Sequence, residues 1–195
     1  MFKTLAIAIV TAAALAGCGT TRLVNSDVNT FGAWPDGRAP ASFVFERLPS
    51  QEARAPEQEQ LEAAALPALE HAGFKQVSSG GADVMVQVAA RTLHFDRIDP
   101  FYDPFWRGNA FYYNRWRGAG LGLGLGAHYG TPYYVNEVSL LIRDGKSKQV
   151  LYETRAQNDG RGSDEGVRMA LFEAALKDFP RTAISPRRVT VEVPR

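Results

Sequence analysis

The sequence predicts an α+β fold, a two-layer sandwich with two amphipathic helices on one face of a mainly antiparallel sheet. Two segments repeat apolar residues at helical spacing, and the strand segments alternate apolar with polar residues, so that one side of the sheet is buried. The expected order is strand, helix, strand, long insertion, strand, strand, helix and a final edge strand. Two layers follow because each helix needs an apolar surface and the strands supply one.

The first half of the fold is predicted from one strand and one helix. Residues 42–48 alternate around Phe43 and Phe45, and Pro49 ends this strand. Pro56 suits the first turn of a helix and Gly73 suits its end, while Pro67 is expected to kink or split it. The apolar stripe of this helix consists of Leu61, Ala65, Leu69 and Ala72.

The second half is predicted from three further patterns. Residues 82–90 alternate strictly, which indicates a strand with one buried side. Residues 138–142 and 150–154 alternate on either side of Asp144-Gly145, which predicts a β-hairpin. Ser163 is expected to cap the second helix, whose apolar stripe contains Val167, Leu171, Ala174 and Ala175, and residues 189–193 form the edge strand.

The first eighteen residues have the layout of a secretory signal peptide. Lys3 supplies the positive charge, an apolar run follows, and Gly17 precedes Cys18, the only cysteine. This order resembles a bacterial lipoprotein signal with its lipobox, so residues 1–17 are expected to be cleaved and Cys18 to carry acyl chains that anchor the protein to a membrane. A transmembrane helix is the alternative, but the run is shorter than the roughly 20 residues that a bilayer requires.

The same region predicts the membrane to which the protein is sorted and the organisation of the mature chain. Position 19 is a glycine, whereas an aspartate there would favour retention at the inner membrane. By analogy with enterobacterial rules, Gly19 predicts a periplasm-facing protein of the outer membrane. Residues 18–41 are interpreted as a lipid-anchored tether with a docking point at Phe31 and Trp34. Residues 42–195 then form the α+β domain.

Charge and cysteine content exclude several classes of protein. Loss of residues 1–17 removes only Lys3 among the charged residues and leaves 21 basic against 21 acidic side chains. A neutral chain has no electrostatic footprint for nucleic acid. A single cysteine allows no disulfide framework within the chain.

Residues 94–134 form an insertion that does not fit the regular pattern. It is aromatic and rich in arginine at first and then contains a Gly-Leu repeat. A loop of this length in a compact domain is functional or disordered. Contact with an envelope protein or glycan is one expectation, through Phe101, Tyr102, Phe105, Trp106, Tyr112, Tyr113 and Trp116.

Two alternatives for the insertion stay open. It could be a floppy hairpin extension that packs some aromatics locally and has no specific role. It could also place the aromatics of residues 101–116 against lipid. Asp96, Asp99 and Asp103 interrupt its apolar character, which favours protein or glycan over lipid.

No motif predicts a catalytic site, a metal site or a cofactor. The three aspartates of the insertion lack the spacing of a calcium loop, and His71, His94 and His128 stand singly. The Gly-Leu repeat lacks the lysine that binds phosphates in a P-loop. We therefore expect a non-enzymatic binding or accessory module, presenting a sheet edge or the insertion to its partner. The alternative is an envelope hydrolase with a dispersed site, which a pocket holding convergent titratable groups would favour.

Several segments in order resemble the DUF4136 family of bacterial envelope lipoproteins, whose function is unknown. They are the lipobox, residues 31–34, 69–74, 82–86, 144–146 and 151–152, and the closing Phe179-Pro180. The chain departs from the family pattern at Tyr152, where members carry a tryptophan. The resemblance implies an α+β fold and an envelope location, and it brings no catalytic residues.

Overall fold

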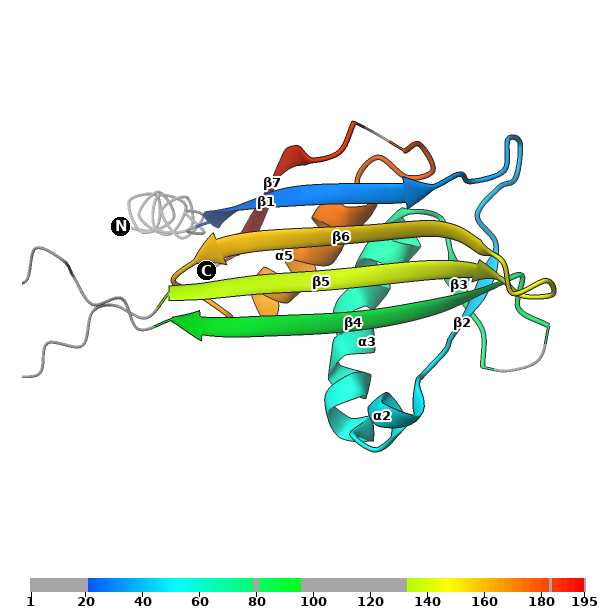
Figure 1. Ribbon diagram of the computed structural model, residues 1–195, viewed down its shortest axis with the longest axis horizontal. Coiled ribbons are helices and arrows are strands. Elements are labelled where there is room, and N and C mark those ends of the chain that lie inside the picture. Colours follow the sequence, from blue (N-terminus) through cyan, green and yellow to red (C-terminus); the bar gives the residue numbers. More distant parts are fainter. Residues whose placement is uncertain (1–20, 79–80, 96–132, 183, 195) are drawn as a thin grey trace, which may run out of the picture.

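The computed structural model describes residues 21–78, 81–95, 133–182 and 184–194, and these form one sheet covered by helices. The sheet has seven strands in the order β3-β2-β4-β5-β6-β1-β7 (Figure 1). The strands are β1 (Thr21–Gly32), β2 (Ser42–Phe45), β3 (Lys75–Gln76), β4 (Val84–Phe95), β5 (Tyr133–Asp144), β6 (Val150–Gly160) and β7 (Arg187–Pro194). The helices are α2 (Pro49–Glu52), α3 (Ala55–His71) and α5 (Glu165–Leu176).

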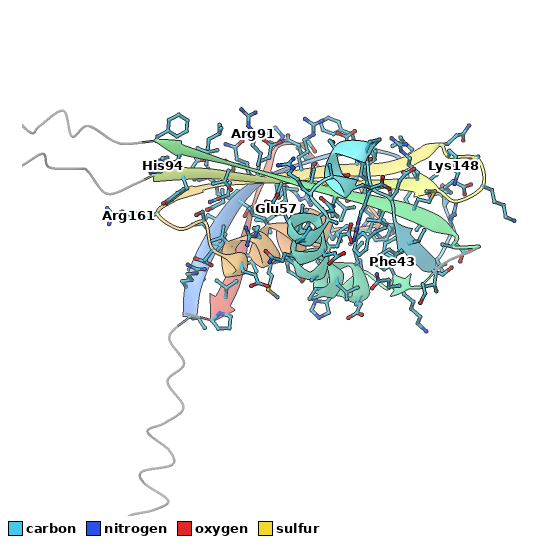
Figure 2. All side chains as sticks on the ribbon, turned by 90° about the horizontal axis from the view of Figure 1, so that it is seen from below. Phe43, Glu57, Arg91, His94, Lys148 and Arg161 are labelled. Carbon is cyan, nitrogen blue, oxygen red and sulfur yellow. The ribbon has the colours of Figure 1, made fainter. Side chains whose placement is uncertain are left out.

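The layers agree with the predicted α+β sandwich. Helices α3 and α5 lie on the same face of the sheet, and the opposite face is open in the described part of the chain (Figures 1 and 2). All strand pairs are antiparallel except those that β2 makes with β3 and β4. The predicted hairpin is confirmed, since β5 and β6 pair on either side of Asp144-Gly145, and β7 is the predicted edge strand.

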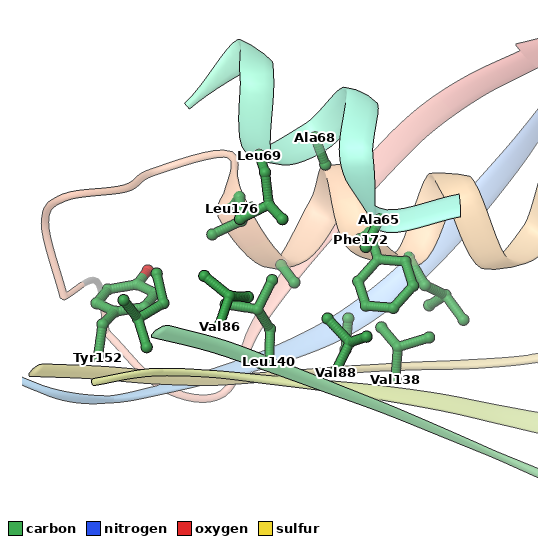
Figure 3. Packing of buried hydrophobic residues seen from close by; sticks show 14 of the residues in the cluster. Ala65, Ala68, Leu69, Val86, Val88, Val138, Leu140, Tyr152, Phe172 and Leu176 are labelled. Carbon is green, nitrogen blue, oxygen red and sulfur yellow. The ribbon is translucent and has the colours of Figure 1, made fainter. Parts of the chain in front are cut away.

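The core lies between the helices and the inner face of the sheet (Figure 3). Alternate residues of β4 and β5 point inward, and the predicted helical stripes pack against them. The largest fully buried side chains include Tyr152, Phe43, Phe74, Phe172, Leu69, Leu140, Ile142 and Leu171. Burial of these apolar side chains is the main favourable contribution to folding.

The interpretation of residues 18–41 as a tether is wrong for the residues that the structure describes. Residues 21–32 form β1, which lies between β6 and β7 and pairs with both. Val24 and Val28 are buried on its inner side, but Ser26 and Thr30 are buried there too, and these polar residues conceal the alternation. Trp34 is also buried, so the connection from β1 to β2 belongs to the domain.

Four smaller expectations are corrected. Helix α3 continues through Pro67, because buried residues on both sides of it hold the helix against the core in spite of the lost backbone donor. The side chain that caps α5 is that of Asp164, which accepts a hydrogen bond from the Val167 N–H, and not that of Ser163. The first predicted strand ends at Phe45 because the chain turns into α2 at Pro49. Residues 94–95 and 133–134, assigned to the insertion, extend β4 and β5.

Candidate functional site

One end of the sheet, here called the stem end, gathers segments that are far apart in the sequence. Antiparallel pairing places Phe95 opposite Tyr133, and Tyr134 opposite Gly160. Strand β1 begins at the same end, because it runs antiparallel to β6 (Figure 1). The stem end consists of residues 21–23, 93–95, 133–135 and 159–161. It is therefore also the end at which β4 leads into residues 96–132.

The two faces of the stem end differ in character. On the helix side, the rings of His94 and Tyr134 lie 5.1 Å apart. On the open side, Leu23 is 61% exposed and Phe95 is 50% exposed. Large apolar side chains exposed to this degree stand out when they gather at one place on a surface.

The start of β1 is fastened to the body of the domain. Arg22 forms an ion pair with Asp164 at the N-terminus of α5, and its Nη1 lies 2.8 Å from the Asp164 Oδ2. The hydrogen bond from Arg22 holds the pKa of Asp164 below its usual value. Beneath this pair, Val24 packs with Ala170 and Val193. The first described residues of the chain are thus held in place from the side of the helix.

A second feature is a hollow of about 440 Å³ beside the outer edge of β4, here called the edge hollow. Strand β2 pairs with β4 only as far as Val86, so the following residues of β4 have no neighbouring strand on that side in the described chain. Gln51 and Gln58 donate to the Val88 carbonyl oxygen from 2.8 and 3.2 Å. The hollow is lined by residues that include Leu48, Gln51, Arg54, Gln58, Gln87 and Arg168.

Buried charge near the edge hollow is compensated. The Glu62 carboxylate is buried and accepts two hydrogen bonds of 2.7 Å from the Arg47 guanidinium. Gln58 adds a longer contact of 3.3 Å to the same carboxylate. A two-point arginine–carboxylate pair of this kind fixes geometry, and here it fastens the chain after β2 to α3.

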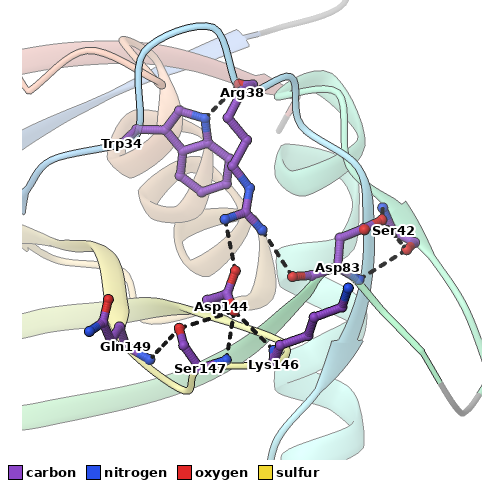
Figure 4. A network of polar contacts seen from close by, with 8 residues as sticks. All are labelled: Trp34, Arg38, Ser42, Asp83, Asp144, Lys146, Ser147 and Gln149. Atoms are coloured by element: carbon purple, nitrogen blue, oxygen red, sulfur yellow. Dashed lines mark hydrogen bonds and ion pairs between the residues drawn. The ribbon is translucent and has the colours of Figure 1, made fainter.

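The opposite end of the sheet carries a polar network around the β5–β6 turn, with two carboxylates at its centre (Figure 4). Asp144 accepts from the Arg38 Nη1 at 2.8 Å and from the Ser147 backbone N–H at 2.7 Å. Asp83 accepts from the Ser42 hydroxyl at 2.6 Å. These hydrogen bonds hold the pKa of both carboxyls below the usual range. Both groups are engaged in closing the turn and the loop before β2.

Tyr152 is fully buried in β6. Its ring meets that of Phe179 edge to face, with 5.1 Å between centroids and an angle of 85°. Burial raises the pKa of its hydroxyl. The Tyr152 ring is therefore part of the hydrophobic core.

Most of the site residues predicted from the sequence lie outside the described residues. These are Gly17, Cys18, the seven aromatics of residues 101–116, Asp96, Asp99, Asp103 and His128. His71 is described, and its Nδ1 lies 3.1 Å from the Glu173 carboxylate. Among the described residues, no group of three or more acidic, histidine or cysteine side chains is placed to hold a metal ion. Within that same part of the chain, no helix is long and apolar enough to cross a membrane.

The edge hollow was not predicted from the sequence. Gln51, Gln58 and Gln87 form no motif, and they meet only because α2, α3 and β4 come together in the fold. The sequence sign was the turn from strand to helix at Pro49, after which β4 has no strand beyond Val86 on the side of β2.

Comparison with protein families decides the classification. The family model described as "Domain of unknown function (DUF4136)" matches residues 24–181. The chain belongs to the DUF4136 family. The match to DUF4136 begins within β1, which agrees with the place of that strand inside the sheet. Among curated proteins, none matches the chain.

Comparison with solved structures gives several that are similar to this DUF4136 chain. The crystal structure of a PDZ domain protein from Parabacteroides distasonis ATCC 8503 matches 95% of this chain with 15% identity and a TM-score of 0.52. The chain covers 42% of that protein, and the likeness concerns the fold alone. Two PelC dodecamer structures from Paraburkholderia phytofirmans align over 77% of this chain, with identities of 10% and 11% and TM-scores of 0.38 and 0.42, and the chain covers 94% of each.

Proposed function

We propose that this DUF4136 protein is an outer-membrane lipoprotein that faces the periplasm and acts as a non-enzymatic binding or accessory module. The observation that carries the proposal is the position of β1, which begins only three positions after Cys18. Three residue steps reach at most about 11 Å. An acyl anchor on Cys18 would therefore keep the stem end close to the membrane and direct the rest of the domain away from it.

The lipobox supports the anchor. The apolar run, the small residues before the cysteine and the absence of any other cysteine all fit lipidation at Cys18 after cleavage behind Gly17. Several acyl chains together hold a protein stably on a membrane, whereas a single chain does so only marginally.

The edge hollow supports a role in binding. An unpaired strand edge offers backbone donors and acceptors, to which an extended segment of another protein can add as a further strand. Val88 is covered by glutamine side chains, but Ala90 and Thr92 on the same edge have no strand partner in the described chain. We propose that an envelope protein or glycan contacts this edge together with the aromatics of residues 101–116.

Mass spectrometry of the mature N-terminus tests the anchor. We expect a triacylated Cys18 in the outer-membrane fraction, and a Cys18→Ser variant that is neither acylated nor cleaved by the lipoprotein route. A Gly19→Asp variant should keep the acyl chains and move to the inner membrane. Soluble, uncleaved wild-type protein would refute the proposal.

Photocrosslinking in cells tests the partner. A crosslinking residue at Gln87, in the edge hollow, or at Phe105 should capture one specific envelope component. The matched control is Gln157, an exposed glutamine of β6 in the middle of the open face. Failure of both Gln87 and Phe105 to give a specific adduct, or an equal adduct from Gln157, would contradict binding at this edge.

A further inference from the structure

We infer that the stem end lies in the interfacial zone of the membrane, with Leu23 and Phe95 in contact with phospholipid. The inference rests on the proposed acyl anchor at Cys18 and adds an orientation to it: the strands stand upright on the bilayer. It concerns only side chains that the structure describes.

Leu23 and Phe95 belong to one face of the sheet. Val24 and Val88 point toward the helices, and side chains alternate along a strand, so Leu23 and Phe95 both point to the open side. Strands β4 and β1 are separated by β5 and β6, and β1 pairs with β6 only from Asp27 onward, so the start of β1 diverges from the end of β4 (Figure 2). Both side chains lie at the extreme end of their strands.

The side chains around them continue the apolar surface. Leu93 and Val135 are opposite each other in the register of β4 and β5, two pairs inward from Phe95 and Tyr133 and therefore on the same face. All of these are on the open side, and Leu93, Tyr133 and Val135 are half-buried. Tyrosine and phenylalanine are suited to the membrane–water boundary, because they present an apolar body there.

Charge at the stem end does not select one class of lipid. Arg161 follows β6 and is exposed, with no acidic partner among the described residues. Asp159 and Glu192 are exposed nearby. Since cations and carboxylates are mixed, apolar contact and the acyl anchor, and not attraction to anionic headgroups, are expected to hold this end in place.

The other end of the sheet also exposes apolar side chains, those of Phe31 and Val150, but it carries the charged Asp83, Asp144 and Lys148 as well. It is separated from the stem end by the length of β5. Twelve residues of antiparallel strand extend about 40 Å. Figure 2 shows His94 and Arg161 at one end and Lys148 at the other. An upright sheet therefore places Lys148 far from the bilayer.

Site-specific labelling of the full chain tests the orientation. Acylated Cys18 has no free thiol, so an introduced cysteine carries the only reactive one. Four variants, Leu23→Cys, Phe95→Cys, Arg155→Cys and Lys148→Cys, would each be labelled with an environment-sensitive fluorophore. Each would then be reconstituted into phosphatidylethanolamine–phosphatidylglycerol vesicles, with and without lipids brominated near the headgroup.

We expect the labels at Leu23 and Phe95 to lose most of their fluorescence to brominated lipid, and those at Arg155 and Lys148 to lose none. Quenching at Arg155 as well would show a sheet lying flat on its open face, and this would overturn the inference. So would the absence of quenching at Leu23 and Phe95.

The mass of the N-terminus separates this failure from that of the proposed function. Acylated protein without quenching at the stem end overturns the orientation and leaves the anchor intact. Protein without acyl chains overturns both. Unchanged circular dichroism of the four variants shows that the labelled positions, all exposed or partly exposed, have not altered the fold.

Discussion

Removal of the Trp34 side chain is expected to destabilise the whole domain, although this residue lies in a connection between strands. Its ring meets Phe179 edge to face at 4.8 Å and Phe74 at 5.7 Å between centroids. Its Nε1 donates to the Arg38 carbonyl oxygen at 2.8 Å. Only 8% of the residue is exposed. Trp34 therefore joins the connection after β1 to the end of both helices.

The magnitude follows from these contacts. Replacing a buried tryptophan by alanine costs about 4 kcal/mol in free energy of unfolding, through lost burial and the cavity left behind. Trp34→Phe keeps most of the aromatic contact and loses the hydrogen bond to Arg38, which costs about 1 kcal/mol. With a denaturant slope of about 2 kcal/mol per molar urea, Trp34→Ala lowers the urea midpoint by about 2 M.

Urea unfolding followed by circular dichroism measures the effect. The matched control is Phe31→Ala, because Phe31 is also aromatic, lies three residues earlier and is 52% exposed. We expect this control to change the free energy of unfolding by less than about 0.5 kcal/mol. If Trp34→Ala changed it by less than about 1 kcal/mol, or no more than Phe31→Ala did, residues 33–41 would not be part of the folded domain.

Two further predictions concern the β5–β6 turn. Gly145→Ala should lower the free energy of unfolding by about 1–3 kcal/mol, because its Cβ would lie 2.2 Å from the Ala82 carbonyl oxygen. The control is Gly160→Ala, whose Cβ would make only ordinary contacts and which should be tolerated. Equal stability of the two variants would refute the clash at Gly145. Asp83 and Asp144 have lowered pKa values in the folded state, so their contribution is complete above about pH 4 and is lost on acidification. The urea midpoint should fall between pH 6 and pH 3, and Asp144→Asn should weaken this dependence.

The parts of the fold that were predictable are those where burial leaves a regular pattern. The alternation in residues 82–90 and the Asp144-Gly145 turn gave β4 and the hairpin correctly. The stripe of α5 was also correct, because its buried residues recur at helical spacing. In each case a single face is buried, so apolar residues recur in the sequence at the spacing of a strand or a helix.

Strand β1 and the edge hollow were missed for different physical reasons. The inner side of β1 carries Ser26 and Thr30, whose burial depends on neighbours that only the folded chain supplies. Thr30, for example, is contacted by Ser185 and Arg187 from the far end of the sequence. The edge hollow depends on where β2 stops, which is a property of three elements together and not of any local pattern.

The place of β1 in the sheet sets the order in which the domain can be completed. Residue 27 pairs with Gln157 on one side and with Arg188 on the other, so the first strand finds both of its partners only near the end of the chain. Pairing over such separations slows folding. A polypeptide that emerges N-terminus first thus carries β1 without any strand partner until β6 has followed, and without its second partner until residues 187–194 have followed. An anchor at Cys18, as proposed above, would therefore be attached beside a segment that has not yet completed its place in the sheet.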